Sequence, residues 1–226
     1  METETLHSEF VRIINCHSDE VWVPSSHNKR VFTESGVKKP IHIVPLGIDE
    51  QLYKNADDRE KMGMSELEGL VGKAPSKGIK KFKFLSLFGW SYRKGPDILI
   101  KSFVREFSDK DDVALIIVAR HSGSSEKAHV DIIREEANRY ARSERQTNLP
   151  QILLYPHIIP EQNMPSIFSM GDAFIHTSRG EGFSLPQIEA AACGLPVISC
   201  NNTGMGEYLR DDNSYMISTN EKEICS

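Results

Sequence analysis

The chain has few cysteines, no regularly spaced histidines and no long apolar segment. Its four cysteines, Cys16, Cys193, Cys200 and Cys225, are too sparse for a disulfide scaffold and form no CxxC pair. The eight histidines lack the spacing of a metal-binding pair. No apolar run approaches the roughly 18 residues of a membrane span, and the N-terminus has no apolar secretory segment. These absences argue against a disulfide-rich, zinc-dependent or membrane-spanning protein.

An excess of positive charge is also missing. The 226 residues include 27 Lys and Arg against 32 Asp and Glu, a formal net charge of -5. Binding to the phosphate backbone of nucleic acid generally requires a basic surface, so we expect no nucleic-acid partner. At about 150 residues per domain, the length corresponds to about one and a half domains. We expect a cytoplasmic globular protein, and contact with a membrane surface stays open.

From about residue 82 onward, short apolar runs alternate with helical patterns. The apolar runs lie at 83–88, 114–118, 152–155, 173–176, 196–199 and 215–217, and the helical patterns at 96–107, 126–145, 161–170 and 185–193. Runs without polar alternation are typical of strands covered on both faces. The alternation predicts an α/β fold with a Rossmann-like, doubly wound parallel sheet, in which ligands bind at the carboxyl ends of the strands.

The first 80 residues predict too little structure for a core of their own. They contain, in order, a helix at 9–15, a strand at 20–23, a helix from 24–26 to Gly36, and an extended stretch at 40–47 between prolines. Trp22 is expected in the core. Residues 51–80 are polar and predict a linker or surface excursion, with a marginal helix near 57–63.

The helix predicted at 185–193 has signals at both ends. Ser184 is expected to be its N-cap, with Gln187 completing a capping box. Pro186 lies in the first turn, where no amide partner is lost, and Gly194 supplies the stop. The strand at 173–176 therefore leads through a short loop directly into a helix N-terminus.

That loop is suited to an anion. Gly180 and Gly182 let a ligand approach the main chain, and the unpaired amides and positive end of the helix favour negative charge. The sequence therefore predicts a phosphate site at residues 178–185.

Two glutamates accompany the predicted phosphate site. At 100° per residue, one helix face carries Leu185, Ile188, Glu189, Ala192 and Cys193, and the opposite face carries Gln187, Ala190 and Ala191. On the apolar side the Glu189 carboxylate needs hydrogen-bond donors, and vicinal sugar hydroxyls would supply two. Glu181, in the loop, would reach the group beyond the phosphates. From the residues alone, two solvated charges on a generic α/β phosphate binder stay an alternative.

The segment EGFSLPQIEAAACGLPVIS, which contains Glu181 and Glu189, resembles the paired-glutamate signature of the retaining, group 1 (family 4 type) glycosyltransferases of GT-B fold. Four more segments agree in order: DEVWVPSSHNKRVFTESGV at 19–37, PIHIVPLGID at 40–49, RKGPDILIKSF at 93–103 and NNTGMGEYL at 201–209. The resemblance covers nearly the whole chain apart from 51–80 and the last few residues. Convergence on five separated motifs in one order is improbable.

The resemblance implies two Rossmann-like domains that face a cleft. Residues 1–38 would be the C-terminal remnant of the acceptor-side domain, 39–80 an interdomain strand and polar linker, and 81–226 a nucleotide-sugar (donor) binding domain, truncated at its end. The implied reaction is retaining transfer of a sugar from a UDP-sugar or GDP-sugar to an unidentified glycan, lipid or small-molecule acceptor. This chain would supply the donor-binding half, with no metal or cofactor, and would be inactive or weakly active alone. A non-catalytic nucleotide-sugar binding module and a GT-B sugar-nucleotide epimerase are the alternatives.

The resemblance also assigns site residues. Glu181 would position the donor sugar without forming a covalent bond, because the leaving phosphate itself assists deprotonation of the acceptor, while Lys94 and Arg93 would contact the diphosphate. The other expected donor contacts are Glu189 at the ribose hydroxyls, Gly182, Phe183, Ser184 and Leu185 at the pyrophosphate, Ile158 and Ile159 at the base, and Glu207. One departure is that Trp90 follows Gly89 where the family often has arginine, so Arg93 is expected to supply that charge.

Overall fold

A seven-stranded sheet forms the centre of the computed structural model, which describes residues 5–54, 64–74, 76, 78–120, 126–145 and 147–218. The elements of the first part are α1 (Ser8–His17), β1 (Val21–Val23), α2 (Ser26–Glu34), β2 (Ile41–Ile43), α3 (Glu50–Lys54), η2 (Met64–Glu66) and β3 (Glu68–Val71). Those that follow are β4 (Phe82–Gly89), η4 (Tyr92–Lys94), α4 (Pro96–Glu106), β5 (Val113–Arg120), α5 (Glu126–Ser143), β6 (Gln151–Tyr155), η5 (Glu161–Asn163), α6 (Met164–Phe168), β7 (Ala173–His176), α7 (Leu185–Ala192), β8 (Val197–Cys200), η6 (Thr203–Glu207) and β9 (Tyr215–Ile217).

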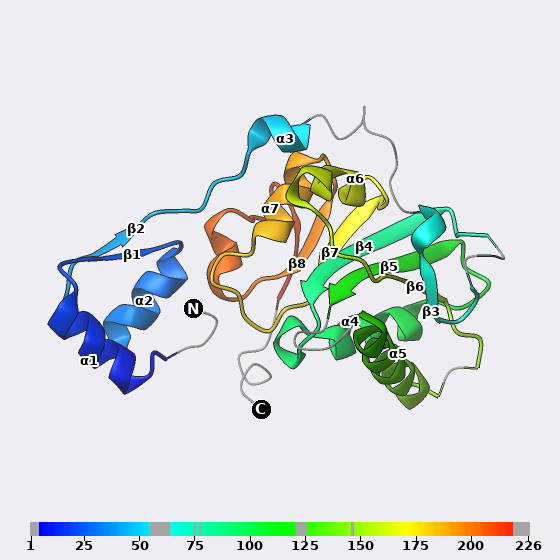
Figure 1. The fold of residues 1–226 in the computed structure, drawn as a ribbon, viewed down its shortest axis with the longest axis horizontal. Coiled ribbons are helices and arrows are strands. Elements are labelled where there is room, and N and C mark those ends of the chain that lie inside the picture. Colours follow the sequence, from blue (N-terminus) through cyan, green and yellow to red (C-terminus); the bar gives the residue numbers. More distant parts are fainter. Residues whose placement is uncertain are drawn as a thin grey trace.

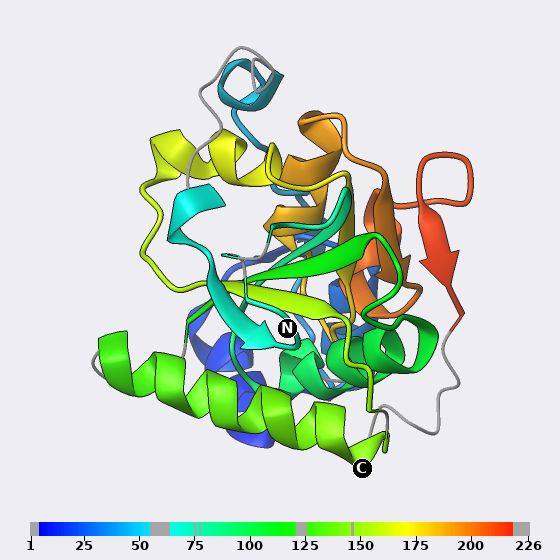
Figure 2. The ribbon, with the colours of Figure 1, turned by 90° about the vertical axis from the view of Figure 1, so that its right-hand side faces the viewer.

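The large sheet has the order β3-β6-β5-β4-β7-β8-β9, and all its pairings are parallel except β3 with β6. Helices α4 and α5 cover one face, and α3, α6 and α7 lie over the other (Figures 1 and 2). The six predicted strands and the Rossmann-like, doubly wound fold are therefore confirmed. The carboxyl ends of β4, β7 and β8 meet at one edge of the sheet.

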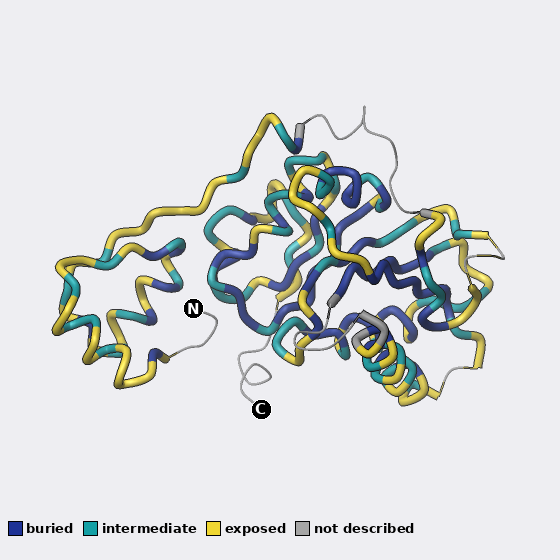
Figure 3. The backbone as a smooth tube through the Cα atoms, viewed as in Figure 1, coloured by how far each residue is buried: buried dark blue, intermediate teal, exposed yellow. Residues whose placement is uncertain are grey.

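The two-sided burial explains why the strands read as unbroken apolar runs. In β5, Leu115 and Ile117 pack with α4 and α5, while the intervening Ile116 and Val118 pack toward α6 and α7. Successive side chains of a strand point to opposite faces, so a strand covered on both sides needs apolar residues at every position. Figure 3 shows this continuous buried centre.

Residues 68–71 correct one prediction. The polar stretch 51–80 is not only a linker, because β3 within it forms the antiparallel edge of the large sheet against β6. Glu68 on this strand pairs with Arg134 of α5 at 2.7 Å. A four-residue strand that contains a glutamate and a glycine has too short a pattern to be recognised from sequence. The predicted helix near 57–63 lies outside the described residues.

The N-terminal elements form a smaller unit beside the large sheet (Figure 1). Strand β2 pairs in parallel with β1, from Val21 opposite Ile41 to Val23 opposite Ile43. The prediction that Trp22 lies in the core is wrong: it is 67% exposed, and its indole N–H donates to Glu20. Its neighbour Val23 is buried, because alternate residues of the strand face opposite sides and the elements of this unit cover only one. Within the described ranges, no helix has the length and apolarity needed to cross a bilayer.

Candidate functional site

Three loops meet at the carboxyl ends of β4, β7 and β8, where the sequence predicts a ligand site. They are held by backbone hydrogen bonds: the amide of Arg179 donates to the carbonyl of Arg93 at 2.8 Å, and the amide of Gly204 to the carbonyl of Glu181 at 2.9 Å. The amide of Glu181 donates to the Thr203 hydroxyl at 2.9 Å. The loop after β7 is therefore fixed from both sides.

Two glycines allow this close approach. A Cβ atom on Gly95, whose φ is +69°, would lie 2.2 Å from the Thr177 carbonyl oxygen, and a Cβ on Gly204 would lie 1.9 Å from the Gly182 carbonyl oxygen. Both distances are far shorter than a non-bonded contact permits, so only glycine fits at either position without movement of the main chain.

The predicted catalytic residues come together on Glu181. Its carboxylate, 5% exposed, lies 2.5 Å from Lys94 Nζ and 3.2 Å from Arg93 Nη1. The guanidinium of Arg93 also donates to the Gly180 carbonyl at 2.7 Å. Burial would raise the pKa of Glu181, but the charge and hydrogen bond of Lys94 outweigh it and hold the pKa below its ordinary value. The carboxylate is therefore ionised at neutral pH.

Trp90, which stands where the family often has arginine, belongs to the core of the sheet. Its ring is buried and stacked on Phe88, and its indole N–H donates to Glu136 at 2.6 Å. The side chain at this position therefore faces the α5 side of the sheet, and the role of Arg93 in place of the family's arginine stays a prediction.

The start of α7 differs from the prediction. The predicted capping box is wrong: Ser184 has a φ of +70°, makes no capping hydrogen bond through its side chain, and its buried hydroxyl contacts no partner in the described part of the chain. Gln187 instead donates to the Ser199 hydroxyl at 2.6 Å. Among the described residues, the amides of Gly182, Phe183 and Ser184 donate to no protein acceptor, so they are available to an anion.

The predicted faces of α7 are also wrong in part. Gln187 and Ala190 are buried against the sheet, whereas Ile188 and Glu189 are half-buried and Leu185 is 36% exposed. The expected apolar face thus points away from the sheet, toward α3. Ala191, placed on the same face as Gln187 and Ala190, is exposed.

Glu189 has a partner that the sequence did not indicate. The phenol of Tyr53, on α3, hydrogen-bonds to its carboxylate. Burial raises the pKa of Glu189, and the Tyr53 hydrogen bond opposes part of that rise. A second tyrosine missed from sequence is Tyr208, whose ring packs 4.8 Å from that of Phe183 and whose hydroxyl donates to the Phe183 carbonyl at 2.9 Å. The signal for Tyr208 was its place in the NNTGMGEYL segment.

Three predicted residues lie outside the Glu181 cluster. Ile158, in the loop after β6, is 67% exposed, and Ile159 packs on the buried cluster beneath α6 and α7. Glu207 accepts a hydrogen bond from the amide of Ser26 at 2.7 Å, so it contacts the N-terminal unit. Their roles toward a donor stay predictions.

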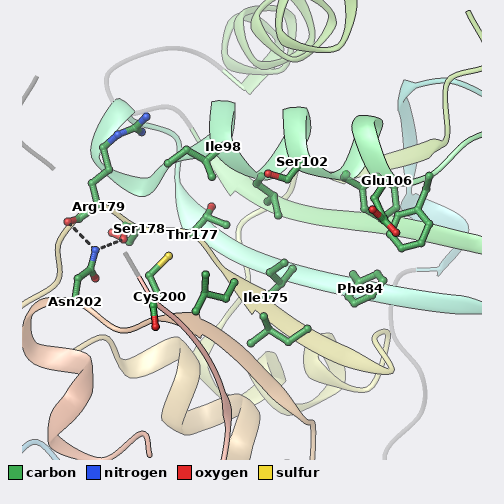
Figure 4. Close-up of a pocket in the computed structure, with 16 residues that line it drawn as sticks. Phe84, Ile98, Ser102, Glu106, Ile175, Thr177, Ser178, Arg179, Cys200 and Asn202 are labelled. Carbon is green, nitrogen blue, oxygen red and sulfur yellow. Dashed lines mark hydrogen bonds between the residues drawn. The ribbon is translucent and has the colours of Figure 1, made fainter. Parts of the chain in front are cut away.

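A cavity of about 490 Å³ lies on the other side of the loop after β7 (Figure 4). Its walls are mainly apolar side chains of α4 and of strands β4, β7, β8 and β9, including Phe84, Ile98 and Ile175. At its polar end the guanidinium of Arg179 is already paired with Asp97 at 2.8 Å. The cavity is therefore separate from the Glu181 cluster.

Comparisons with known proteins identify the family to which the chain belongs. Residues 80–225 match the family described as "Glycosyl transferases group 1". The D-inositol 3-phosphate glycosyltransferase of Segniliparus rotundus is 27% identical over 174 residues, which cover 76% of this chain and 34% of that protein. The mannosylfructose-phosphate synthase of Agrobacterium fabrum is 23% identical over 168 residues, 74% of this chain and 34% of that protein. The chain thus spans about a third of the length of these relatives.

A solved structure with a similar fold is Anabaena Alr3699/HepE in complex with UDP and glucose. Its TM-score is 0.68 at 18% identity, and the match covers 96% of this chain and 55% of that one.

Proposed function

The chain belongs to the group 1 glycosyl transferases, and on that premise we propose that it binds a nucleotide-sugar donor and supplies the donor half of a retaining sugar transfer. The observation that carries the proposal is the convergence of Lys94, Arg93 and Glu181 beside the unpaired amides that lead into α7. The glycosyltransferase and synthase names of the relatives favour transfer over a binding module or an epimerase.

The diphosphate is the part of the donor that this site fits best. Two cationic side chains, the amides of Gly182 to Ser184 and the positive end of α7 all favour negative charge in the same place. Lys94 and Arg93 are 15% and 34% exposed, so both can turn from Glu181 to an incoming phosphate. In this proposal they stabilise the leaving diphosphate without a metal ion.

In this proposal Glu181 and Glu189 bind the two sugar groups of the donor, the transferred sugar and the ribose. Glu181 is held ionised, which makes it a hydrogen-bond acceptor for hydroxyls of the transferred sugar. Glu189, near the middle of α7, would accept from the ribose hydroxyls, with Tyr53 beside it.

During transfer, positive charge develops at the anomeric carbon while the diphosphate departs. The site then stabilises the negative charge on the phosphate oxygens, and the departing phosphate accepts the proton of the acceptor hydroxyl on the same face of the sugar. Glu181 positions the donor in this scheme. A double displacement would require a carboxylate close to the anomeric carbon, and in this proposal Glu181 binds hydroxyls of the sugar instead.

Calorimetry of the 226-residue chain with UDP, GDP and their glucose and mannose derivatives tests the proposal. Uridine is the first choice because the Anabaena structure holds UDP and glucose. Lys94→Ala is expected to weaken nucleoside-diphosphate binding about tenfold or more, because it removes a charge-assisted hydrogen bond to phosphate.

Lys110→Ala is the matched control, because Lys110 is an exposed lysine that precedes β5. The unfolding midpoint is measured alongside, since loss of Lys94 leaves a buried carboxylate with one cation fewer. An unchanged dissociation constant in Lys94→Ala, or no binding of any nucleotide by the unmodified chain, would refute the proposal.

A further inference from the structure

His176, the last residue of β7, lies against the Glu181 cluster but has no part in the proposed chemistry so far. Its side chain is completely buried. Nδ1 accepts a hydrogen bond from the amide of Ser178 at 3.2 Å. A neutral imidazole that accepts at Nδ1 carries its proton on Nε2, so the loop that follows β7 fixes the tautomer.

The Nε2–H group points toward Glu181. Nε2 lies 3.6 Å from Glu181 Oε1, beyond hydrogen-bond distance, and within the described ranges it makes no hydrogen bond. A fully buried donor without an acceptor is rare in folded proteins, and such a group often marks a place where a ligand or a rearrangement completes the contact. Here a small movement of the Glu181 carboxylate would bring Oε1 within hydrogen-bond distance of Nε2.

His176 is neutral around neutral pH. Burial lowers its pKa to about 4, and the positive charges of Lys94 and Arg93 act in the same direction, against the opposing effect of Glu181. A neutral, fully buried imidazole is suited to donating a fixed hydrogen bond and not to exchanging protons with solvent.

Lys94 and His176 aim at the same carboxylate oxygen. Lys94 Nζ is 2.5 Å from Glu181 Oε1 and His176 Nε2 is 3.6 Å from it. The Lys94 side chain is 15% exposed, against 5% for Glu181 and 0% for His176. An incoming phosphate would therefore draw the lysine away and leave the histidine as the donor in place.

We propose that His176 is a positioning residue that acts through Glu181: once a donor diphosphate engages Lys94, the Nε2–H of His176 donates to Glu181 and holds its carboxylate toward the sugar hydroxyls. This inference rests on the proposed function of the site. It predicts that His176 matters for binding the sugar part of the donor and not for binding the diphosphate.

Two variants separate this role from simple packing. In His176→Gln, the side-chain amide nitrogen reaches about as far as Nε2 and keeps a donor toward Glu181. In His176→Asn, the shorter amide can still accept from the Ser178 amide but cannot reach Glu181. The pair thus separates the contact with Glu181, which only His176→Gln keeps, from the contact with the Ser178 amide, which only His176→Asn keeps.

Calorimetry on the full chain measures UDP and UDP-glucose, or the nucleotide and nucleotide sugar that the binding panel selects. His176→Asn is expected to weaken nucleotide-sugar binding about tenfold while changing nucleoside-diphosphate binding less than twofold, and His176→Gln to restore most of the loss. Equal nucleotide-sugar affinity in both variants, or equal losses for both ligands in His176→Asn, would overturn the proposal. Failure of the unmodified chain to bind any nucleotide would instead refute the proposed function.

A measurement on the unmodified chain does not depend on either variant folding. Nitrogen-15 NMR of the imidazole is expected to show the neutral Nε2–H tautomer from pH 6 to 8, with the Nε2–H proton moving downfield when nucleotide sugar binds. A protonated ring, the Nδ1–H tautomer, or an unmoved proton in the saturated complex would each contradict the inference.

Discussion

At the scale of single residues, two buried titratable neighbours are kept in opposite states. Glu181 is ionised because Lys94 and Arg93 offset the cost of burying its charge, whereas His176 has no charged group in hydrogen-bond contact among the described residues and is neutral. The site therefore holds one negative and two positive charges before any ligand arrives. A bound phosphate would add negative charge to the site, whereas the neutral imidazole of His176 adds no charge.

The neutral state of His176 predicts a pH dependence of stability. Its pKa is about 4 in the folded chain against an ordinary value of 6.5, so below pH 6.5 the unfolded chain binds a proton that the folded chain does not. Stability contributed by this residue is full above pH 6.5 and falls as the pH drops toward 4. At about 1.4 kcal/mol per pH unit, roughly 2 kcal/mol would be lost between pH 6.5 and pH 5.

Urea unfolding of the chain at pH 7 and pH 5 measures this loss. His176→Gln removes the titrating group, so its stability difference between the two pH values should be smaller by roughly the same 2 kcal/mol. His42→Gln serves as the control, because His42 is a half-exposed histidine of the N-terminal unit. If His176→Gln and the unmodified chain lose stability in parallel, His176 titrates near its ordinary pKa.

Residues that stand in recognisable motifs could be predicted to belong to the site. Contacts between residues that are distant in sequence could not be predicted. Glu181 and Lys94 stand in motifs with glycines around them, which singled them out as site residues, and the structure brings them into contact. Tyr53 and His176 have ordinary sequence surroundings, an amphipathic turn and the end of an apolar strand. Their contacts with Glu189 and Glu181 arise only when α3 packs on α7 and when β7 brings its last residue beneath the loop.

At the scale of elements, α7 shows how tertiary contacts override local signals. The sequence of this helix fits a serine cap and an apolar face, yet Ser184 is left-handed and makes no cap, and the buried side of the helix carries Gln187. A buried glutamine is tolerated because Ser199 and Met205 contact its amide nitrogen. A Ser184 cap would have bonded an amide of the first turn of α7, and its absence cannot be read from residue types alone.

The strands were predictable for the opposite reason. Each long apolar run follows from coverage on both faces of the sheet, a requirement that local sequence alone can satisfy. Edge strand β3 does not need apolar residues at every position, because only part of its length packs against other elements. Its pattern of Glu68, Gly69, Leu70 and Val71 was also too short to detect.

The contact between η6 and the loop after β7 predicts the effect of a single methyl group. Gly204→Ala would place a Cβ 1.9 Å from the Gly182 carbonyl oxygen, so the main chain must move. We expect a loss of about 2 kcal/mol or more in the free energy of unfolding, with weaker nucleotide binding because the loop is displaced.

Gly206→Ala, two residues along in the same element, is the matched control. The nearest atom to its added Cβ would be 4.0 Å away, and its φ is not positive. Its stability should change by less than about 0.5 kcal/mol. Denaturant unfolding of the two variants compares them directly, and similar losses would show that the close approach at Gly204 is absent in solution.

At the scale of the whole molecule, the N-terminal unit contacts the loops that hold the candidate site. The Ser25 hydroxyl donates to the Gly182 carbonyl at 3.0 Å, and the amide of Ser26 donates to Glu207 at 2.7 Å. Both contacts come from the start of α2, so the positive end of one helix meets a carboxylate of η6. Movement of the N-terminal unit is therefore coupled to the loop at Gly182.

Glu207 tests that coupling. Glu207→Ala removes the acceptor of the Ser26 amide, whereas Glu207→Gln keeps an oxygen in the same place. Loss of one such hydrogen bond, worth about 1 kcal/mol, should speed hydrogen exchange of the Ser26 amide about fivefold in Glu207→Ala. Exchange in the buried strand β5 should not change. Equal exchange of Ser26 in all three proteins would show that α2 and η6 are apart in solution.

Hydrogen exchange of the Ser26 amide also tests whether Glu207 contacts the nucleotide sugar. If Glu207 turns from Ser26 to a bound nucleotide sugar, the Ser26 amide of the unmodified chain should exchange faster when ligand is added. If Glu207 serves only to hold α2, ligand should leave that exchange rate unchanged or lower it. Binding of the nucleotide sugar would therefore release α2 in the first case and not in the second.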